Sequence, residues 1–286
     1  MALDRVGFIA DVLRFPLADA PRLSPAQAWE RAASCTDLED ISLLPLRGFV
    51  VLRKAIDAAD IEHALAVLHA NPNVSKVENG GRVYSDQLSF HSFGRRFRNR
   101  LADGLHSMDD LEVLPPSYAT GGGRAEQLDV RDGMQFVSTD KAKAKASLCP
   151  GDCIGDWHVD GAGQNGIGVH KLWLLVDKEP GTEQRALSNI KLAPLAATVE
   201  DDPLRHSGVL PRSAVAQCVP HTDGFAACQA AELARVRRLQ YNAAFLEEVG
   251  CVPALDPGDA IFFLSNVLHR TQDMLADRVA MLINVT

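Results

Sequence analysis

The chain has 286 residues, of which 47% are hydrophobic, which is enough to bury a large core and indicates a globular protein. Its formal net charge of -8 at pH 7 argues against a protein that binds nucleic acid or an anionic membrane through its overall field. No apolar run approaches the roughly 18 residues of a membrane-spanning helix, and charges interrupt the N-terminal segment where a signal peptide would be apolar. We therefore expect a cytoplasmic protein whose six cysteines are reduced thiols.

The first part of the chain is predicted to be mostly helical, with one early strand. Residues 47–55, RGFVVLRKA, are a short β-branched run that favours a strand. Residues 57–70 have the apolar spacing of a helix, and Asp57 is suited to be its N-cap. The Asn, Pro and Gly content of residues 71–83 predicts a loop, and the spacing in residues 92–105 predicts another helix.

After residue 125 the sequence changes to short apolar runs separated by Gly, Pro and Asp. Such runs indicate a β sandwich or jelly roll rather than a parallel sheet. A strong helical pattern at about 225–250 is expected to be an insertion. The prediction is a single domain, mainly β with flanking helices: a helical flank over 1–125 and a jelly-roll core over 126–286. The predicted strands are 133–139, 154–160, 170–178, 189–197, 259–269 and 278–286.

Two metal or cofactor patterns are weak. Cys149 and Cys153 form a close pair, but no second pair or Cys/His partner lies at the spacing of a zinc site, so buried or incidental thiols are favoured. Residues 161–166 match G-x-G-x-x-G, which binds a dinucleotide only where it follows a strand and opens a helix. Residues 167–178, IGVHKLWLLVDK, are rich in β formers and predict a strand, which disfavours a nicotinamide site.

His158 and Asp160 are two residues apart, so on a strand they project from the same face. An imidazole and a carboxylate in this arrangement are two of the three ligands of a facial iron(II) site, which needs one more histidine. Taken alone, the pair is better explained as a surface feature. A third ligand must therefore come from elsewhere in the sequence.

The C-terminal stretch offers that histidine. A Pro-Gly-Asp turn precedes a predicted apolar strand that ends at His269, and a polar hairpin is expected to lead to a second strand that begins at Arg278. Two-residue alternation predicts that His269 shares a face with the inward residues of its strand: Ile261, Phe263, Ser265 and Val267. Arg278 would then lie near His269, where a guanidinium can bind a carboxylate in an apolar pocket. The alternative is that both residues cap a strand end in water.

In this order, the His158-Val159-Asp160 pair, the turn, His269 and Arg278 resemble the iron(II)- and 2-oxoglutarate-dependent oxygenases. Residues 48–64, GFVVLRKAIDAADIEHA, are similar to the phytanoyl-CoA hydroxylase-like branch. The resemblance implies iron(II) held by His158, Asp160 and His269, and hydroxylation of an unactivated carbon with O2 consumed and succinate and CO2 released. It also implies that Arg278 and Thr271 bind 2-oxoglutarate, with Arg270 second to Arg278 because it should point the opposite way. Trp173, on the strand after the His-Asp pair, is a candidate to stack near the co-substrate, and packing in the core is an equally good explanation of it.

The substrate is a small molecule whose identity the sequence does not give. Gln135, Tyr84 and His91 precede the predicted core and are candidates to line its entrance. Arg95 belongs to GRRFRNR, which could contact an anionic substrate, although a solvated helix face is the favoured explanation of these arginines. The helix at 225–250 is a candidate lid. The rival function is a cupin-like metal protein, an isomerase or a sensor, which does not use 2-oxoglutarate and has no need of Arg278.

Overall fold

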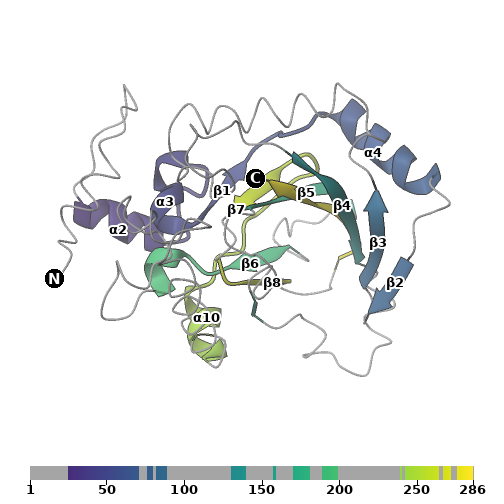
Figure 1. Ribbon diagram of the computed structural model, residues 1–286. Helices are drawn as coiled ribbons and strands as arrows, with labels where there is room; N and C mark the ends of the chain where they lie inside the picture. Colours follow the sequence, from purple (N-terminus) through teal and green to yellow (C-terminus); the bar gives the residue numbers. More distant parts are fainter. Residues whose placement is uncertain are drawn as a thin grey trace, which may run out of the picture.

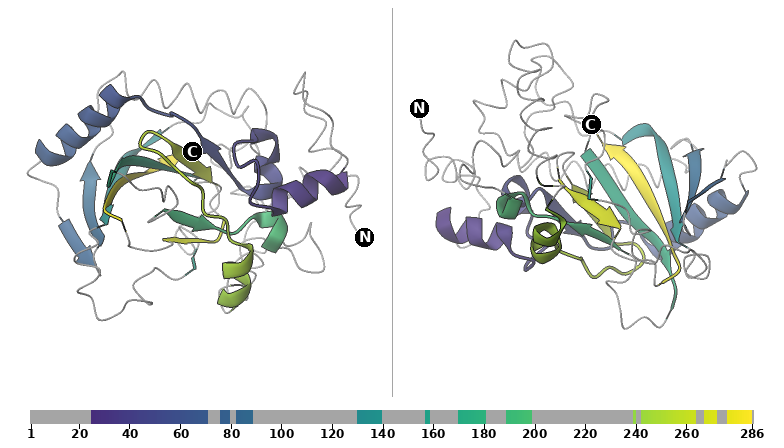
Figure 2. Two further views of the ribbon diagram at one scale, coloured as in Figure 1. Left: turned by 180° about the vertical axis from the view of Figure 1, so that it is seen from behind. Right: turned by 90° about the horizontal axis from the view of Figure 1, so that it is seen from below.

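The computed structural model describes residues 25–70, 76–79, 82–88, 130–139, 157–158, 170–180, 189–198, 239, 242–263, 267–271 and 276–285. Within these residues, seven strands form one curved antiparallel sheet and two short strands form a second sheet on its concave side (Figure 1). The helices lie around the edges and on the outer faces of the two sheets (Figure 2). The prediction of a mainly β protein with flanking helices agrees with this arrangement.

The large sheet has the strand order β1-β7-β5-β9-β4-β3-β2, and every neighbouring pair is antiparallel. The centre of β5, Leu172 to Val176, is buried throughout, as expected of a strand with both faces covered. The strands are β1 (Phe49–Leu52), β2 (Lys76–Asn79), β3 (Arg82–Leu88), β4 (Val130–Thr139), β5 (His170–Lys178), β7 (Ala260–Phe263) and β9 (Arg278–Val285).

Strands β2 and β3 correct the predicted loop at residues 76–79 and 82–83, while its other residues lie outside the described part of the chain. They pair as a hairpin in which Asn79 is opposite Arg82, so that only Gly80 and Gly81 connect them. A Gly-Gly pair is typical of two-residue hairpin turns, because both central positions of such a turn favour positive φ. The glycines that suggested a loop thus lie between two paired strands, and β3 continues the sheet by pairing with β4.

The small sheet consists of β6 (Ile190–Leu192) and β8 (His269–Thr271). Two isolated bridges widen it, one between His158 and His269 and one between Leu192 and Cys251. The prediction of one strand over 259–269 is wrong, because β7 pairs within the large sheet and β8 within the small one. The predicted hairpin between His269 and Arg278 is also wrong, since β9 pairs with β4 and β5 rather than with β8.

The Pro-Gly-Asp turn before β7 forms as predicted. Gly258 has φ +95°, and a Cβ there would lie 2.7 Å from the carbonyl oxygen of Ile56, so the position suits only glycine. The carboxylate of Asp259 accepts from the backbone N–H groups of Lys54 and Asp256 and from Arg53 Nη1. The turn thereby joins the start of β7 to the end of β1.

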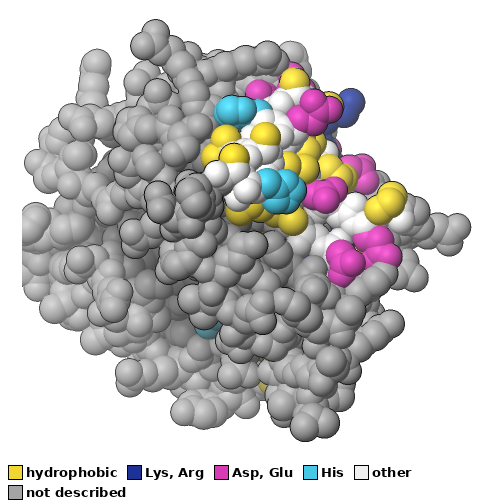
Figure 3. Space-filling view, turned by 90° about the vertical axis from the view of Figure 1, so that its right-hand side faces the viewer, with side chains coloured by type: hydrophobic (Ala, Val, Ile, Leu, Met, Phe, Trp, Pro, Cys, Tyr) yellow, Lys and Arg dark blue, Asp and Glu magenta, His cyan; other side chains and the backbone are white. Residues whose placement is uncertain are grey.

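The helical elements are α2 (Pro25–Ala33), η1 (Ile41–Leu43), α3 (Leu44–Arg47), α4 (Ala58–Ala70), η3 (Leu195–Thr198) and α10 (Ala243–Val249). The predictions of a strand at β1 and a helix at α4 are confirmed, and the Asp57 carboxylate caps α4 by accepting from the N–H of Asp60 at 3.0 Å. Helix α4 packs on β5, and the charged side chains on the surface near it are mostly acidic, with histidines between them (Figure 3).

The predicted helix over 225–250 is interrupted where the structure describes it. Asn242 has φ -111° and ψ 58°, outside the helical region, and its side chain caps α10 by accepting from the N–H of Phe245. Helix α10 therefore begins anew at Ala243. Its buried residue Leu246 belongs to a hydrophobic cluster with Trp157 and Leu268, which lies on the outer face of the small sheet.

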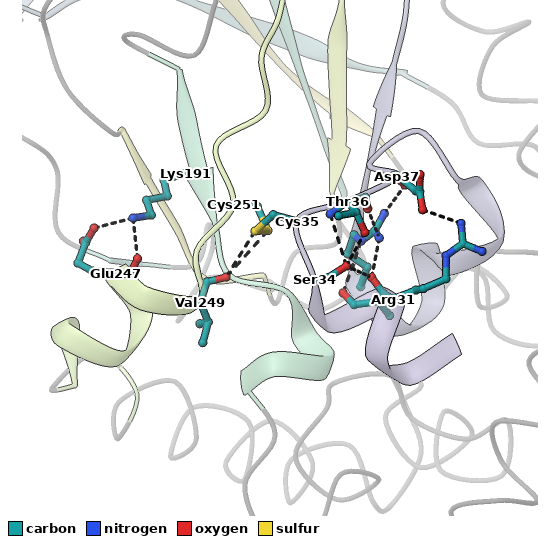
Figure 4. The surroundings of a disulfide bond; sticks show 11 residues. Arg31, Ser34, Cys35, Thr36, Asp37, Lys191, Glu247, Val249 and Cys251 are labelled. Carbon is teal, nitrogen blue, oxygen red and sulfur yellow. Dashed lines mark hydrogen bonds and ion pairs between the residues drawn. A yellow bond between two sulfur atoms is a disulfide. The ribbon is translucent and has the colours of Figure 1, made fainter. Parts of the chain in front are cut away.

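A disulfide joins Cys35, just after α2, to Cys251, just after α10 (Figure 4). The expectation that all six cysteines are reduced is therefore wrong for this pair, which is 216 residues apart in the sequence and 5.2 Å apart between Cα atoms. A separation of this length leaves no local signal from which the pairing could be predicted. Among the described residues, no helix has the length and apolar character needed to cross a membrane.

Candidate metal centre

His158 and His269 lie directly opposite each other in the small sheet. The N–H of His158 donates to the carbonyl of His269 at 3.0 Å, and the N–H of His269 donates back at 2.9 Å. Residues opposite each other in an antiparallel pair project from the same face, and the two imidazole centroids are 4.5 Å apart. The structure thus brings together two predicted ligands that are far apart in the sequence, while Asp160 lies outside the described residues.

The ring of His269 is oriented by a hydrogen bond to Val267 and by packing against Phe263. Nδ1 lies 2.9 Å from the carbonyl oxygen of Val267, and because a carbonyl only accepts, Nδ1 carries the proton. In the neutral imidazole the lone pair is then on Nε2, the arrangement typical of histidines that bind a metal. Phe263 packs against the ring with centroids 4.8 Å apart, and His269 is buried.

Arg278 opens β9 as predicted and lies opposite Lys178 on β5. It is only 3% exposed, and its Cζ lies 5.1 Å from the centroid of the Trp173 ring. A guanidinium on an aromatic face is held in a defined orientation. Trp173, a predicted neighbour of the co-substrate, is thus in contact with Arg278.

These groups share the space between the two sheets. Phe263 is opposite Lys171 on β5, and Trp173 is two residues further along that strand, so Phe263 and Trp173 lie on one face of the large sheet. Phe263 contacts His269 of the small sheet, so this face is turned toward the histidines. The buried guanidinium and the imidazole pair consequently face a common interior.

The remaining predicted residues are placed only in part. The structure describes only the backbone of three of them. Thr271 is opposite Ile190 in the small sheet, Gln135 is opposite Leu282 on β9, and Tyr84 is opposite Val137 on β4. Two more lie outside the described residues: His91 and Arg95. In the described part of the chain, no group of three or more His, Cys, Asp or Glu side chains is placed to hold a metal ion.

The sequence interpretation missed an ion-pair network behind the histidines. Glu247 on α10 accepts from Trp157 Nε1 at 2.9 Å, from Lys191 Nζ at 2.9 Å and from Arg270 Nη2 at 2.8 Å. Burial raises the pKa of the Glu247 carboxyl, but the hydrogen bonds from Arg270, Lys191 and Trp157 outweigh it and lower the pKa to about 2. The expectation that Arg270 points away from the interior agrees with these contacts. The alternation of Arg270 with His269 along one strand was the only sequence feature that pointed to this network.

Comparisons with known proteins found no matching family model and no matching curated protein. Among solved structures, AviO1 from Streptomyces viridochromogenes Tue57 is 11% identical with a TM-score of 0.47, over 88% of this chain and 96% of that one. HygX from Streptomyces hygroscopicus, solved with nickel and 2-oxoglutarate bound, is 10% identical with a TM-score of 0.46, over 86% and 85%. The epimerase SnoN from nogalamycin biosynthesis is 14% identical with a TM-score of 0.45, over 92% and 83%. At these values the similarity establishes neither a family nor a reaction.

Proposed function

We propose that this chain is a non-haem iron(II)- and 2-oxoglutarate-dependent oxygenase with a jelly-roll core in a single domain. The observation that carries the proposal is the backbone bridge between His158 and His269, which sets two imidazoles side by side on neighbouring strands. Asp160, two residues after His158, would complete a set of two imidazoles and one carboxylate. Such a set leaves neighbouring coordination positions open for a co-substrate and O2.

The described residues fit the metal. The carbonyl of Val267 keeps the proton of His269 on Nδ1, so that in the neutral imidazole the lone pair on Nε2 is available to a cation. The hydrogen bond also fixes the ring orientation, as outer contacts of metal ligands usually do. The contact of Phe263 on His269 makes one side of the site apolar, which limits the access of water.

Arg278 would bind the distal carboxylate of 2-oxoglutarate, and the hydroxyl of Thr271 would be a second donor. The Trp173 ring would line the pocket beside the co-substrate. The support for this role is the burial of Arg278 and its contact with Trp173 on the face turned toward the histidines. Arginine suits this task because its planar fork matches a carboxylate. The protein's own part in the reaction is therefore to hold the two carboxylate-binding centres, metal and guanidinium, at a fixed separation.

When bound, iron(II) would activate O2, which is the oxidant: one oxygen atom would be inserted into a C–H bond of the substrate, and the other would enter the new carboxylate of succinate as 2-oxoglutarate is oxidised and loses CO2. Within the wider class, hydroxylation of a small, anionic substrate by an enzyme of the phytanoyl-CoA hydroxylase-like branch is the reaction we propose. Gln135, Tyr84, His91 and Arg95 are the proposed substrate contacts.

A cytoplasmic location stays a prediction, and the Cys35–Cys251 disulfide is of a kind more common in oxidising compartments.

The test is to supply the purified protein with iron(II), ascorbate, 2-oxoglutarate and a wide panel of small acids, thioesters and sugar derivatives, and to measure succinate. Succinate above the no-enzyme background, raised further by one substrate class, supports the oxygenase. Metal binding with no succinate under any condition would instead favour the cupin-like isomerase or sensor.

Replacement of Arg278 by alanine tests the co-substrate site. We expect Arg278→Ala to raise the KM for 2-oxoglutarate at least tenfold, because a charge-assisted contact to a carboxylate contributes about 1.5–3 kcal/mol. Arg53, an exposed arginine just after β1 that pairs with Asp259, provides a control whose replacement should leave this KM unchanged. An unchanged KM in the Arg278 variant would mean that another cation binds the co-substrate.

A further inference from the structure

The two histidine-bearing segments have a second face, which points away from the space between the sheets. Trp157 directly precedes His158, and Arg270 directly follows His269, so strand alternation turns both toward the outer side. Lys191 on β6 is opposite Arg270 and lies on this outer side as well. The outer face therefore carries a direct neighbour of each proposed histidine ligand, together with a lysine from the adjoining strand.

One carboxylate contacts all three of these side chains. Glu247 Oε1 lies 2.9 Å from Trp157 Nε1 and 2.7 Å from Arg270 Nε, while Oε2 lies 2.8 Å from Arg270 Nη2 and 2.9 Å from Lys191 Nζ. The guanidinium of Arg270 also lies over the Trp157 ring, with 5.7 Å between Cζ and the ring centroid. Both oxygens of Glu247 are thus used, and each histidine segment is tied to α10 through the residue beside its histidine.

Helix α10 is itself held in place on this face. Gly250, just after the helix, lies so close to the small sheet that a Cβ there would be 2.7 Å from Lys191 Cε and 2.9 Å from Trp157 Cη2. Leu246 packs with Trp157 and Leu268 in the cluster beneath the helix. Cys251, which follows Gly250, forms a disulfide with Cys35 and a backbone β-bridge with Leu192. Glu247 therefore projects from a support that is fixed by packing, by a backbone bridge and by a disulfide (Figure 4).

We propose that Glu247 is a positioning residue that sets the separation and orientation of His158 and His269 through Trp157 and Arg270. This inference rests on the proposed function, because it assigns the network to the metal site. Glu247 does not touch the histidines, so its effect must pass along the backbone of two short segments. Each of these segments pairs with the small sheet over only a few residues, so outer contacts contribute a large share of its order.

The experiment is a titration of the full chain with Co(II) under anaerobic conditions, followed by the visible absorption of the bound ion. Glu247→Gln keeps the shape of the side chain and removes its charge. Glu248→Gln makes the same change one residue further along α10, at an exposed position, and is the matched control. We expect about tenfold weaker Co(II) binding and an altered absorption envelope at saturation for Glu247→Gln, within the range reported for outer-shell partners of metal ligands.

The outcomes separate the two proposals. Failure of the wild-type protein to bind Co(II) would overturn the proposed function and this inference with it. If the wild type binds Co(II) and both glutamine variants bind it with the same affinity and spectrum, the inference alone is overturned. This holds even if Glu247→Gln lowers the melting temperature, because a merely structural role predicts lower stability and an unchanged spectrum at saturation. Should Glu247→Gln not fold, Trp157→Phe removes one donor and keeps an aromatic ring, and it must show the same change in spectrum to a smaller degree.

Discussion

Arg47 shows how a single side chain can be essential to the fold without being visible as such in the sequence. It is fully buried, and its guanidinium donates to the carbonyls of Arg31 at 2.9 Å, Thr36 at 2.8 Å and Asp37 at 2.8 Å. Burial lowers its pKa, while Asp40 and Asp37 act to raise it. Arg47 thus satisfies carbonyls at the end of α2 and in the following turn, which contains Cys35.

We expect Arg47→Met to lower the free energy of unfolding by about 3 kcal/mol, because buried carbonyls lose their donor. Urea unfolding followed by circular dichroism measures this loss. Arg31→Met is the control, since the ion pairs of the partly exposed Arg31 contribute at most about 1 kcal/mol. Equal losses in the two variants would show that the carbonyl contacts of Arg47 add nothing to stability.

The depressed pKa of Glu247 predicts a pH dependence at the same scale. An ordinary glutamate has a pKa near 4.5, and in the folded chain the value is about 2, so the folded state favours the ionised carboxylate. The resulting stabilisation is complete above about pH 4.5 and is lost as the pH falls toward 2. The difference in melting temperature between the wild type and Glu247→Gln should therefore be constant near neutral pH and shrink through this acid window. A difference that stays constant down to pH 2 would contradict the assignment.

Strands and helices that are determined by interactions within a few residues of the chain were predicted correctly from the sequence. The β-branched run of β1, the apolar run of β5 and the capped helix α4 appear where expected, because side-chain alternation, helical spacing and capping act within a few residues. The division of residues 259–269 between β7 and β8 was missed, since a crossing from one sheet to another depends on packing partners distant in the sequence. The β2–β3 hairpin was missed because two glycines outweighed the β formers on either side.

The Cys35–Cys251 disulfide links the helical N-terminal segment to the end of α10. By closing a loop that contains most of the chain it restricts the unfolded state, and its reduction should lower the free energy of unfolding by about 2–5 kcal/mol. Comparison of chemical unfolding with and without a phosphine reductant tests this. Cys35→Ser should show the same loss and no further response to the reductant. If the oxidised and reduced chains are equally stable, the link does not contribute to folding.

At the scale of the whole molecule, the candidate site is the product of two sheets. The small sheet supplies the histidines, and the large sheet supplies Phe263, Trp173 and Arg278 on the face turned toward them. The chemical types of His158, His269 and Arg278 and their order suggested these residues from sequence alone. The spatial relation of His269 and Arg278 was predicted incorrectly as a hairpin, and Glu247 was not predicted at all, because a carboxylate that acts through neighbours of the ligands has no spacing rule.

The central claim is that His158 and His269, with Asp160, bind one ferrous ion. Anaerobic titration with iron(II), with bound metal quantified after gel filtration, tests it most directly in the wild type and in His158→Ala, His269→Ala and His63→Ala. We expect one iron per chain in the wild type and in His63→Ala, whose histidine lies on the surface helix α4. We expect loss of at least 90% of the bound iron in the other two variants, on the order expected when one of three ligands is removed. Full iron binding in either His158→Ala or His269→Ala would contradict it.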